Sequence, residues 1–150
     1  QAQGHPADIG VVVLDTAVTG VTPASLPALG SLEGSLTQSS VFTAVGYGDF
    51  AGLPDPQTPP FPNDGYRRYA VSSFNSLGPA YLRLSQNASH GDGGTCNGDS
   101  GGPNFIGAGP TETNVIASIT ITGDTRCKST NVGYRLDLPE AQSFLAPFLS

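Results

Sequence analysis

Six short runs of this 150-residue chain are rich in β-forming residues or alternate between apolar and polar positions, as strands with one buried face do. The runs are residues 9–14, 41–47, 66–74, 81–84, 115–121 and 132–136. Turn-forming residues separate them, because the chain holds 20 glycines and 13 prolines, and only 12% of its residues are charged. The pattern predicts an all-β domain with many turns.

Two stretches break the alternation. Residues 54–62 contain five prolines, which exclude a central strand, so we expect an exposed loop. Residues 23–40 are rich in Ser, Leu, Gly and Pro without a clear period, and they read as a connector between two β units.

One helix is expected, over residues 137–150 at the C-terminal end. Asp137 is a suitable N-cap, Pro139 suits the first turn, and Glu140 lies three residues after the cap. The apolar positions with helical spacing are Leu138, Ala141, Phe144, Leu145 and Phe148, and we expect this face to dock on the core. Pro147 is expected to fray or stop the helix.

Charge and hydropathy narrow the classes of partner. The net charge is −6 and the pI is near 4.5, which disfavours binding to nucleic acids or to anionic membranes. No apolar run approaches the length of a membrane span, and we expect no basic-then-apolar signal segment in this chain. Because the chain does not begin with Met, we expect its start at Gln1 to be a processing or cloning boundary. Asn87-Ala88-Ser89 is a glycosylation sequon, which has meaning only in a eukaryotic secretory host.

The string Cys-Asn-Gly-Asp-Ser-Gly-Gly-Pro begins at Cys96 and indicates that Ser100 is a candidate nucleophile. A serine hydroxyl needs a neighbouring base to take its proton, and the oxyanion that forms needs backbone N–H donors. Gly98 and Ser100 can supply those N–H groups, and Gly101 and Gly102 let the backbone pack closely behind the nucleophile.

This string resembles the active-site loop of the trypsin and chymotrypsin family of serine endopeptidases, and secreted bacterial members are the most similar in pattern. Asp8, followed by Ile-Gly-Val-Val-Val-Leu, resembles the segment that carries the family's catalytic aspartate. Residues 44–48 resemble the Gly-Trp-Gly that opens the second barrel, and residues 115–122 and 133–137 resemble its substrate-binding and last strands.

The resemblance implies a chymotrypsin-like double β-barrel with a C-terminal helix, of which this chain holds about two-thirds. Residues 1–22 would be the end of the first barrel, 23–40 the connector, 41–136 the complete second barrel and 137–150 the helix. It also favours a Cys96–Cys127 disulfide and hence a secreted protein, whereas the sequence alone allows one disulfide or two thiols.

The implied activity is peptide-bond hydrolysis through an acyl-enzyme on Ser100, with Asp8 orienting the base and a polypeptide as substrate. The resemblance places the substrate pocket at Gly94, Thr95, Asn97, Thr120, Thr122 and Val132. Gly94 occupies the position at which the family's trypsins carry an aspartate. We therefore expect a shallow, uncharged pocket for small or medium apolar side chains.

The departure from the family is the base. The family's histidine precedes the aspartate by some forty-five residues, and this chain contains only His5 and His90. We therefore expect the base to lie in the missing N-terminal part of the same protein and the chain alone to be inactive. In this family the ammonium of an activated N-terminus pairs with a carboxylate, and Asp99 matches that carboxylate. We expect this N-terminus, too, to lie outside the chain. The alternative is a protease-like binding module without catalysis.

Other hydrolase classes fit less well. An α/β hydrolase needs a histidine after its nucleophile, and none follows Ser100. Subtilisins carry their catalytic residues in the order Asp, His, Ser, and Asp8, His90 and Ser100 follow that order. Only ten residues separate His90 from Ser100, however, and the sequence shows no alternating helices, so we disfavour this class. We expect no metal site and no cofactor, because the histidines and cysteines show no ligand spacing.

Overall fold

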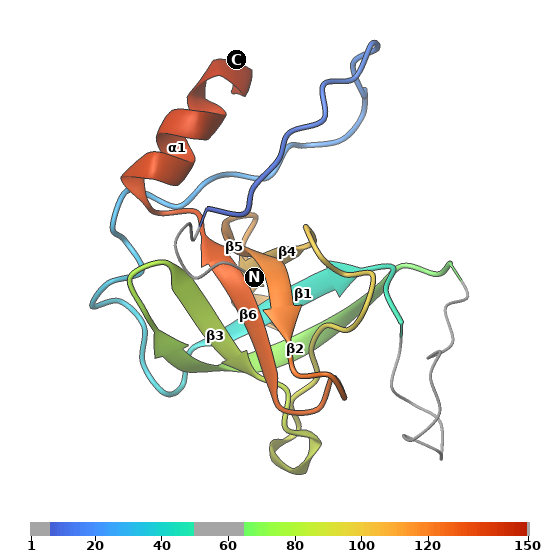
Figure 1. Cartoon of the computed structure of the whole chain (residues 1–150), viewed down its shortest axis with the longest axis vertical. Helices are drawn as coiled ribbons and strands as arrows, with labels where there is room; N and C mark the ends of the chain where they lie inside the picture. The colour runs from blue at the N-terminus through green and yellow to red at the C-terminus, as the bar shows by residue number, and fades with distance from the viewer. Residues whose placement is uncertain (1–6, 50–64, 150) are drawn as a thin grey trace.

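Antiparallel strands close into one β-barrel in the computed structural model, which describes residues 7–49 and 65–149 (Figure 1). The six strands are β1 (Val41–Gly46), β2 (Arg68–Leu77), β3 (Tyr81–Ser85), β4 (Pro103–Ile106), β5 (Ile116–Gly123) and β6 (Thr130–Arg135). Their order around the barrel is β1-β2-β3-β6-β5-β4, and β4 pairs with β1 to close it. Closure leaves the described barrel without an open edge.

Five of the strands confirm runs predicted from the sequence, one strand was not predicted, and one predicted run forms no strand. β4 was not expected, because it is only four residues long and begins at a proline directly after the glycines of the nucleophile loop. Residues 9–14 form no strand in the structure. A strand requires a hydrogen-bonding partner, and the described part of the chain offers none to this run. The side chains of Val12, Val13 and Leu14 are 83%, 74% and 60% exposed.

The apolar core has two parts. Leu32, Phe42, Leu82, Leu84 and Ala117 form the first, inside the barrel and under the 23–40 connector. The second consists of Tyr134, Leu136 and Ala141, against which Ile9, Leu26 and residues of β5 pack. The connector is therefore more than a linker, since it supplies a fully buried leucine and a bridge between Ser25 and Val115.

The barrel also encloses a polar chain. Asn131 Nδ2 donates to Asn104 Oδ1 at 2.7 Å, and Asn104 Nδ2 donates to Thr120 Oγ1 at 3.1 Å. All three side chains are buried, so these bonds compensate for the loss of water and connect β4, β5 and β6.

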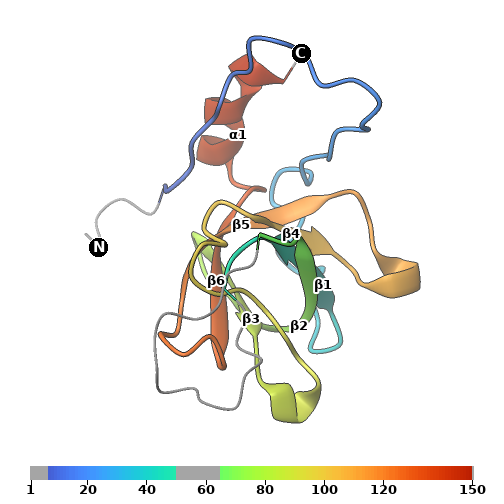
Figure 2. The same ribbon diagram turned by 90° about the vertical axis from the view of Figure 1, so that its right-hand side faces the viewer.

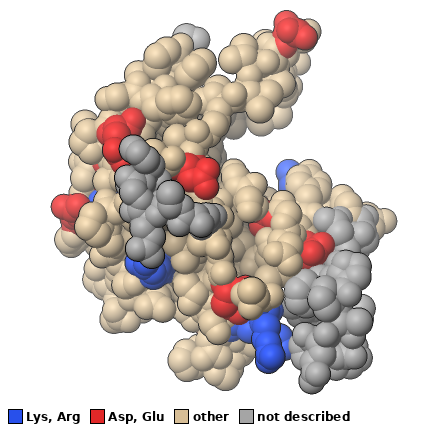
Figure 3. Space-filling view, in the orientation of Figure 1, with Lys and Arg blue, Asp and Glu red and all other residues tan. Residues whose placement is uncertain are grey.

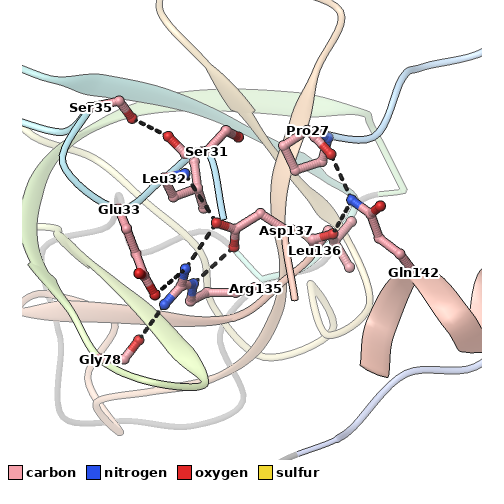
Figure 4. A network of polar contacts seen from close by, with 10 residues as sticks. All are labelled: Pro27, Ser31, Leu32, Glu33, Ser35, Gly78, Arg135, Leu136, Asp137 and Gln142. Atoms are coloured by element: carbon pink, nitrogen blue, oxygen red, sulfur yellow. Dashed lines mark hydrogen bonds and ion pairs between the residues drawn. The ribbon is translucent and has the colours of Figure 1, made fainter. Parts of the chain in front are cut away.

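A buried ion pair fixes the end of β6 (Figure 4). Arg135 and Asp137 are 1% and 0% exposed, and two hydrogen bonds of 2.9 and 2.8 Å join the guanidinium to the carboxylate. Arg135 also donates to the Gly78 carbonyl and to Glu33, and Asp137 Oδ2 accepts the N–H of Leu32. The network joins the connector and the β2–β3 turn to the last strand.

The C-terminal helix α1 (Pro139–Leu145) continues into the short 3-10 helix η3 (Ala146–Phe148). The prediction that Asp137 caps it was wrong, because that carboxylate is engaged by Arg135 and the N-cap is Leu138. Tyr134 donates to Glu140 at 2.8 Å and attaches the helix to the barrel. Of the predicted apolar face, Leu138, Ala141 and Leu145 pack on the core. Phe144 and Phe148 remain partly exposed.

The N-terminal segment extends beyond the barrel at the end where α1 lies, as both ribbon views show (Figures 1 and 2). The 3-10 helices η1 (Ala88–His90) and η2 (Gly109–Thr111) lie in the β3–β4 and β4–β5 loops. The space-filling view shows acidic side chains spread over one face, with fewer basic ones (Figure 3). No helix in the described residues is long and apolar enough to span a membrane. The prolines of 54–62 lie outside the described residues.

Candidate functional site

The nucleophile loop, residues 96–102, connects the β3 side of the barrel to β4. Gly98 and Gly101 adopt φ of 93° and 83°, a region that side chains disfavour, so glycine is needed at both positions. Gly101 N–H donates to the Thr120 carbonyl at 2.8 Å, and Thr120 N–H donates to the Gly102 carbonyl at 2.9 Å. The loop is therefore attached to β5.

Asp99 holds the loop to the segment that follows β1. Its Oδ1 accepts the Gly48 N–H at 2.8 Å, and its Oδ2 accepts the Cys96 N–H at 2.9 Å. A Cβ atom at Gly46 or Gly48 would overlap the Asp99 side chain, so the two glycines leave room for the carboxylate. The sequence identified this glycine pair as the start of the second barrel but not as the cradle for Asp99.

Backbone donors in the loop fall into two groups. The N–H groups of Asp99, Gly101 and Gly102 each donate to a carbonyl. Those of Gly98 and Ser100 have no acceptor among the described residues, and both residues are exposed. The Ser100 hydroxyl likewise has no hydrogen-bonding partner there. The Asn97 N–H likewise has none, so three donors of the loop, including those of Gly98 and Ser100, lack an acceptor among the described residues.

The Cys96–Cys127 disulfide is present, with Cα atoms 5.1 Å apart. It joins the nucleophile loop to the β5–β6 loop across 31 residues of sequence. No other cysteine exists in the chain. The bond fixes one wall of the cleft that lies beside Ser100.

Ser100 lies at the boundary of two clefts. The larger, of about 910 Å³, is bounded by the N-terminal segment, β5 and α1, and Asp8 and Ser100 both line it. Its other walls are mainly apolar, from Ile9, Leu26, Ile116, Ile119, Ile121, Leu136, Leu145 and Leu149. Asp8 is exposed, and its carboxylate has no hydrogen-bonding partner among the described residues. The structure thus brings Asp8 and Ser100 to one cleft without joining them by a hydrogen bond.

The smaller cleft, of about 230 Å³, adjoins the disulfide. Four of the predicted pocket residues line it with Ser100, namely Thr95, Asn97, Thr120 and Thr122, and Thr125 adds a further threonine. Gly94 and Val132 lie elsewhere. Gly94 faces a third cleft of about 530 Å³, where a Cβ atom would overlap the Gln86 side chain, and Val132 pairs with Arg83 and Thr122.

One carboxylate lines the smaller cleft, that of Asp124, and it is already engaged. Its Oδ1 accepts the N–H groups of Lys128, Ser129 and Thr130 at 2.8 to 3.2 Å. Burial raises the pKa of Asp124, but these N–H groups outweigh burial and hold the pKa below its ordinary value. Asp92 does not line this cleft, because Ser73 binds its Oδ1 from β2.

Neither histidine reaches Ser100 in the described structure. His90 ends η1 and is exposed, and it lines neither of the two clefts that contain Ser100. His5 lies outside the described residues. The described walls of both clefts therefore contain no imidazole to serve as a base. Within residues 7–49 and 65–149, no group of three or more His, Cys, Asp or Glu side chains could hold a metal ion.

No known protein-family model matches the chain, and no curated protein matches it. The fold defines it as a single six-stranded antiparallel barrel in the described residues, with one disulfide and a C-terminal helix.

Proposed function

We propose that this chain carries the nucleophile of a serine endopeptidase with a trypsin-like fold. The observation that carries the proposal is the nucleophile loop, in which the N–H groups of Gly98 and Ser100 lie beside the exposed Ser100 hydroxyl and have no acceptor among the described residues. Two amides that point at a developing oxyanion are the main electrostatic requirement of acyl transfer. Asp99 and the disulfide hold the loop from both sides.

In the proposed mechanism, Ser100 Oγ attacks the carbonyl carbon of a peptide bond. The hydroxyl proton passes to a histidine outside this chain, and the Gly98 and Ser100 amides bind the oxyanion. The histidine then protonates the leaving amine, the C–N bond breaks and an acyl-enzyme remains, which water hydrolyses by the same route. Asp8 orients the histidine and stabilises its charged form.

We further propose that a first barrel packs over the larger cleft, which completes a double β-barrel. The apolar walls of that cleft and the exposed side chains of Val12, Val13 and Leu14 support this architecture. Residues 9–14 would then pair as the last strand of the first barrel. The disulfide supports an extracellular location, because such bonds persist in oxidising compartments.

The smaller cleft is proposed to receive the substrate side chain on the acyl side of the cleaved bond. Its walls are rich in threonine, and both oxygens of the Asp124 carboxylate already accept backbone N–H groups, which leaves this anion less able to bind a lysine or arginine side chain. We therefore expect cleavage after small or medium uncharged residues, with a change of about 10- to 200-fold in kcat/KM per methylene. A peptide library cleaved mainly after Arg or Lys would contradict this specificity.

The second candidate function is a protease-like binding module. It is favoured by the absence of a histidine from the described walls of both Ser100 clefts. Such a module would bind peptides without cleaving them.

Hydrolysis of a peptide library by a longer form of the protein, one that includes the proposed first barrel, separates the two candidates. The protease predicts cleavage and a trapped acyl-enzyme on Ser100, both abolished by Ser100→Ala. Ser129→Ala is the matched control, since it alters another exposed serine and should leave cleavage unchanged. Binding without turnover in the wild type would favour the module.

A further inference from the structure

The loop between β3 and β4 carries the Asn87-Ala88-Ser89 sequon, which the proposed peptidase function does not use. No other asparagine of the chain is followed two residues later by Ser or Thr. Both ribbon views place the yellow-green part of this loop, around η1, at the end of the barrel opposite α1 (Figures 1 and 2). Ala88, Ser89 and His90 are exposed, and Asn87 is partly buried.

The orientation of the Asn87 amide is determined by its neighbours. Its Oδ1 accepts the Ser89 N–H at 3.1 Å and the Ser89 hydroxyl at 2.7 Å. Since a backbone N–H can only donate, the oxygen must face Ser89 and the nitrogen must face away. Nδ2 has no acceptor among the described residues, and it is not among their buried unpartnered atoms. The nitrogen is therefore open to solvent.

The backbone of the loop does not depend on that nitrogen. The Asn87 carbonyl accepts the N–H groups of His90 and Asp92, and the Asn87 N–H donates to Ser85 Oγ. A substituent on Nδ2 would leave all of these bonds intact. Asn87 lines the third cleft, of about 530 Å³, and neither of the two clefts that contain Ser100.

We propose that Asn87 is a site of asparagine-linked glycosylation in a eukaryotic secretory pathway. The amide Nδ2 forms a bond to the anomeric carbon of the first sugar of a lipid-linked oligosaccharide donor. The bond between that carbon and the donor's pyrophosphate oxygen breaks, the lipid pyrophosphate leaves, and one amide proton is released. No oxidant or reductant is needed. The disulfide agrees with passage through such a compartment.

The test is secretion of the protein from eukaryotic cells, followed by mass spectrometry before and after peptide-N-glycosidase treatment in heavy-oxygen water. We expect a glycan that the enzyme removes, with heavy oxygen incorporated at residue 87. Asn87→Gln and Ala88→Pro should abolish the modification, since proline between Asn and Ser blocks the sequon. Ser89→Thr keeps a hydroxyl beside Asn87 and should retain it.

Asn75→Gln is the matched control, because Asn75 is an exposed asparagine outside any sequon, and the modification should persist. Secreted, disulfide-bonded protein that is unmodified at Asn87 would overturn the proposal. A glycan that persists in Asn87→Gln would also overturn it. Both readouts are covalent masses, so they do not depend on peptidase activity.

Discussion

The barrel and the N-terminal segment contain similar apolar residues, but these residues are buried in the barrel and exposed in the segment. Phe42 and Leu82, in barrel strands, are 0% exposed, whereas Val12 is 83% exposed. Each barrel strand has a neighbour on both sides, and residues 9–14 have none among the described residues. An apolar β-forming run therefore specifies a tendency to form a strand, while the pairing partner decides whether the strand exists.

The largest stability effect is expected at the ion pair that ends the barrel. Asp137→Ala leaves the Arg135 guanidinium buried without its carboxylate and should lower the free energy of unfolding by about 3 to 5 kcal/mol. Chemical denaturation measures this. Replacing both residues with apolar side chains should cost less than the single change. Equal losses in the single and double variants would contradict a penalty from an unpaired charge.

Matched truncations in the two regions sharpen the comparison. Leu82→Ala should destabilise the protein by about 2 to 5 kcal/mol, because it opens a cavity in the barrel core. Val12→Ala should change the stability of this chain by less than about 0.5 kcal/mol. In a longer protein with a first barrel, the same Val12→Ala change should become costly. A small effect there would argue against a strand at 9–14.

Removing the disulfide tests how much this bond contributes to the stability of the protein. The paired change Cys96→Ser and Cys127→Ser should cost about 2 to 4 kcal/mol, mainly through greater freedom of the unfolded chain. Thermal unfolding with and without a reducing agent gives the value. If reduction leaves the wild-type midpoint unchanged, the bond contributes no stability.

The smallest effect is a pH dependence. Hydrogen bonds hold the pKa values of Asp92 and Asp124 below the ordinary 3.8, although burial opposes them. Because each folded pKa is depressed, the stabilisation is complete well above pH 3.8 and is lost as the pH falls through the folded values. Asp92→Asn and Asp124→Asn should each reduce the loss in the free energy of unfolding that occurs as the pH falls into the acid range. An unchanged loss in both variants would contradict this assignment.

The sequence predicted most of the barrel because its strands follow period-two patterns between glycines and prolines. It missed β4, whose four residues begin at Pro103 and are too short to show a period. It also assigned Asp137 the wrong role, as the N-cap of the helix. An aspartate before a helix suits a cap and an ion pair equally well by sequence, and only the fold shows that it binds Arg135. These errors arise from contacts between residues far apart in the sequence.

The candidate site was predictable to a similar extent. The local string named Ser100 and its two amides, and the resemblance named the disulfide, which is confirmed. Gly94 was assigned to the pocket from the family resemblance, and no sequence signal revealed that Gln86 occupies the space where a side chain at position 94 would lie. The catalytic roles of Ser100 and Asp8 stay predictions.

The central claim is that Ser100 is a nucleophile whose base lies outside this chain. The most direct measurement is the rate at which a fluorophosphonate probe labels Ser100 in this chain and in the longer protein. We predict rapid labelling in the longer protein, and labelling slower by a factor of about 10⁴ to 10⁶ in this chain. Comparable rates would mean that His5 or His90 already serves as the base, and they would contradict the account.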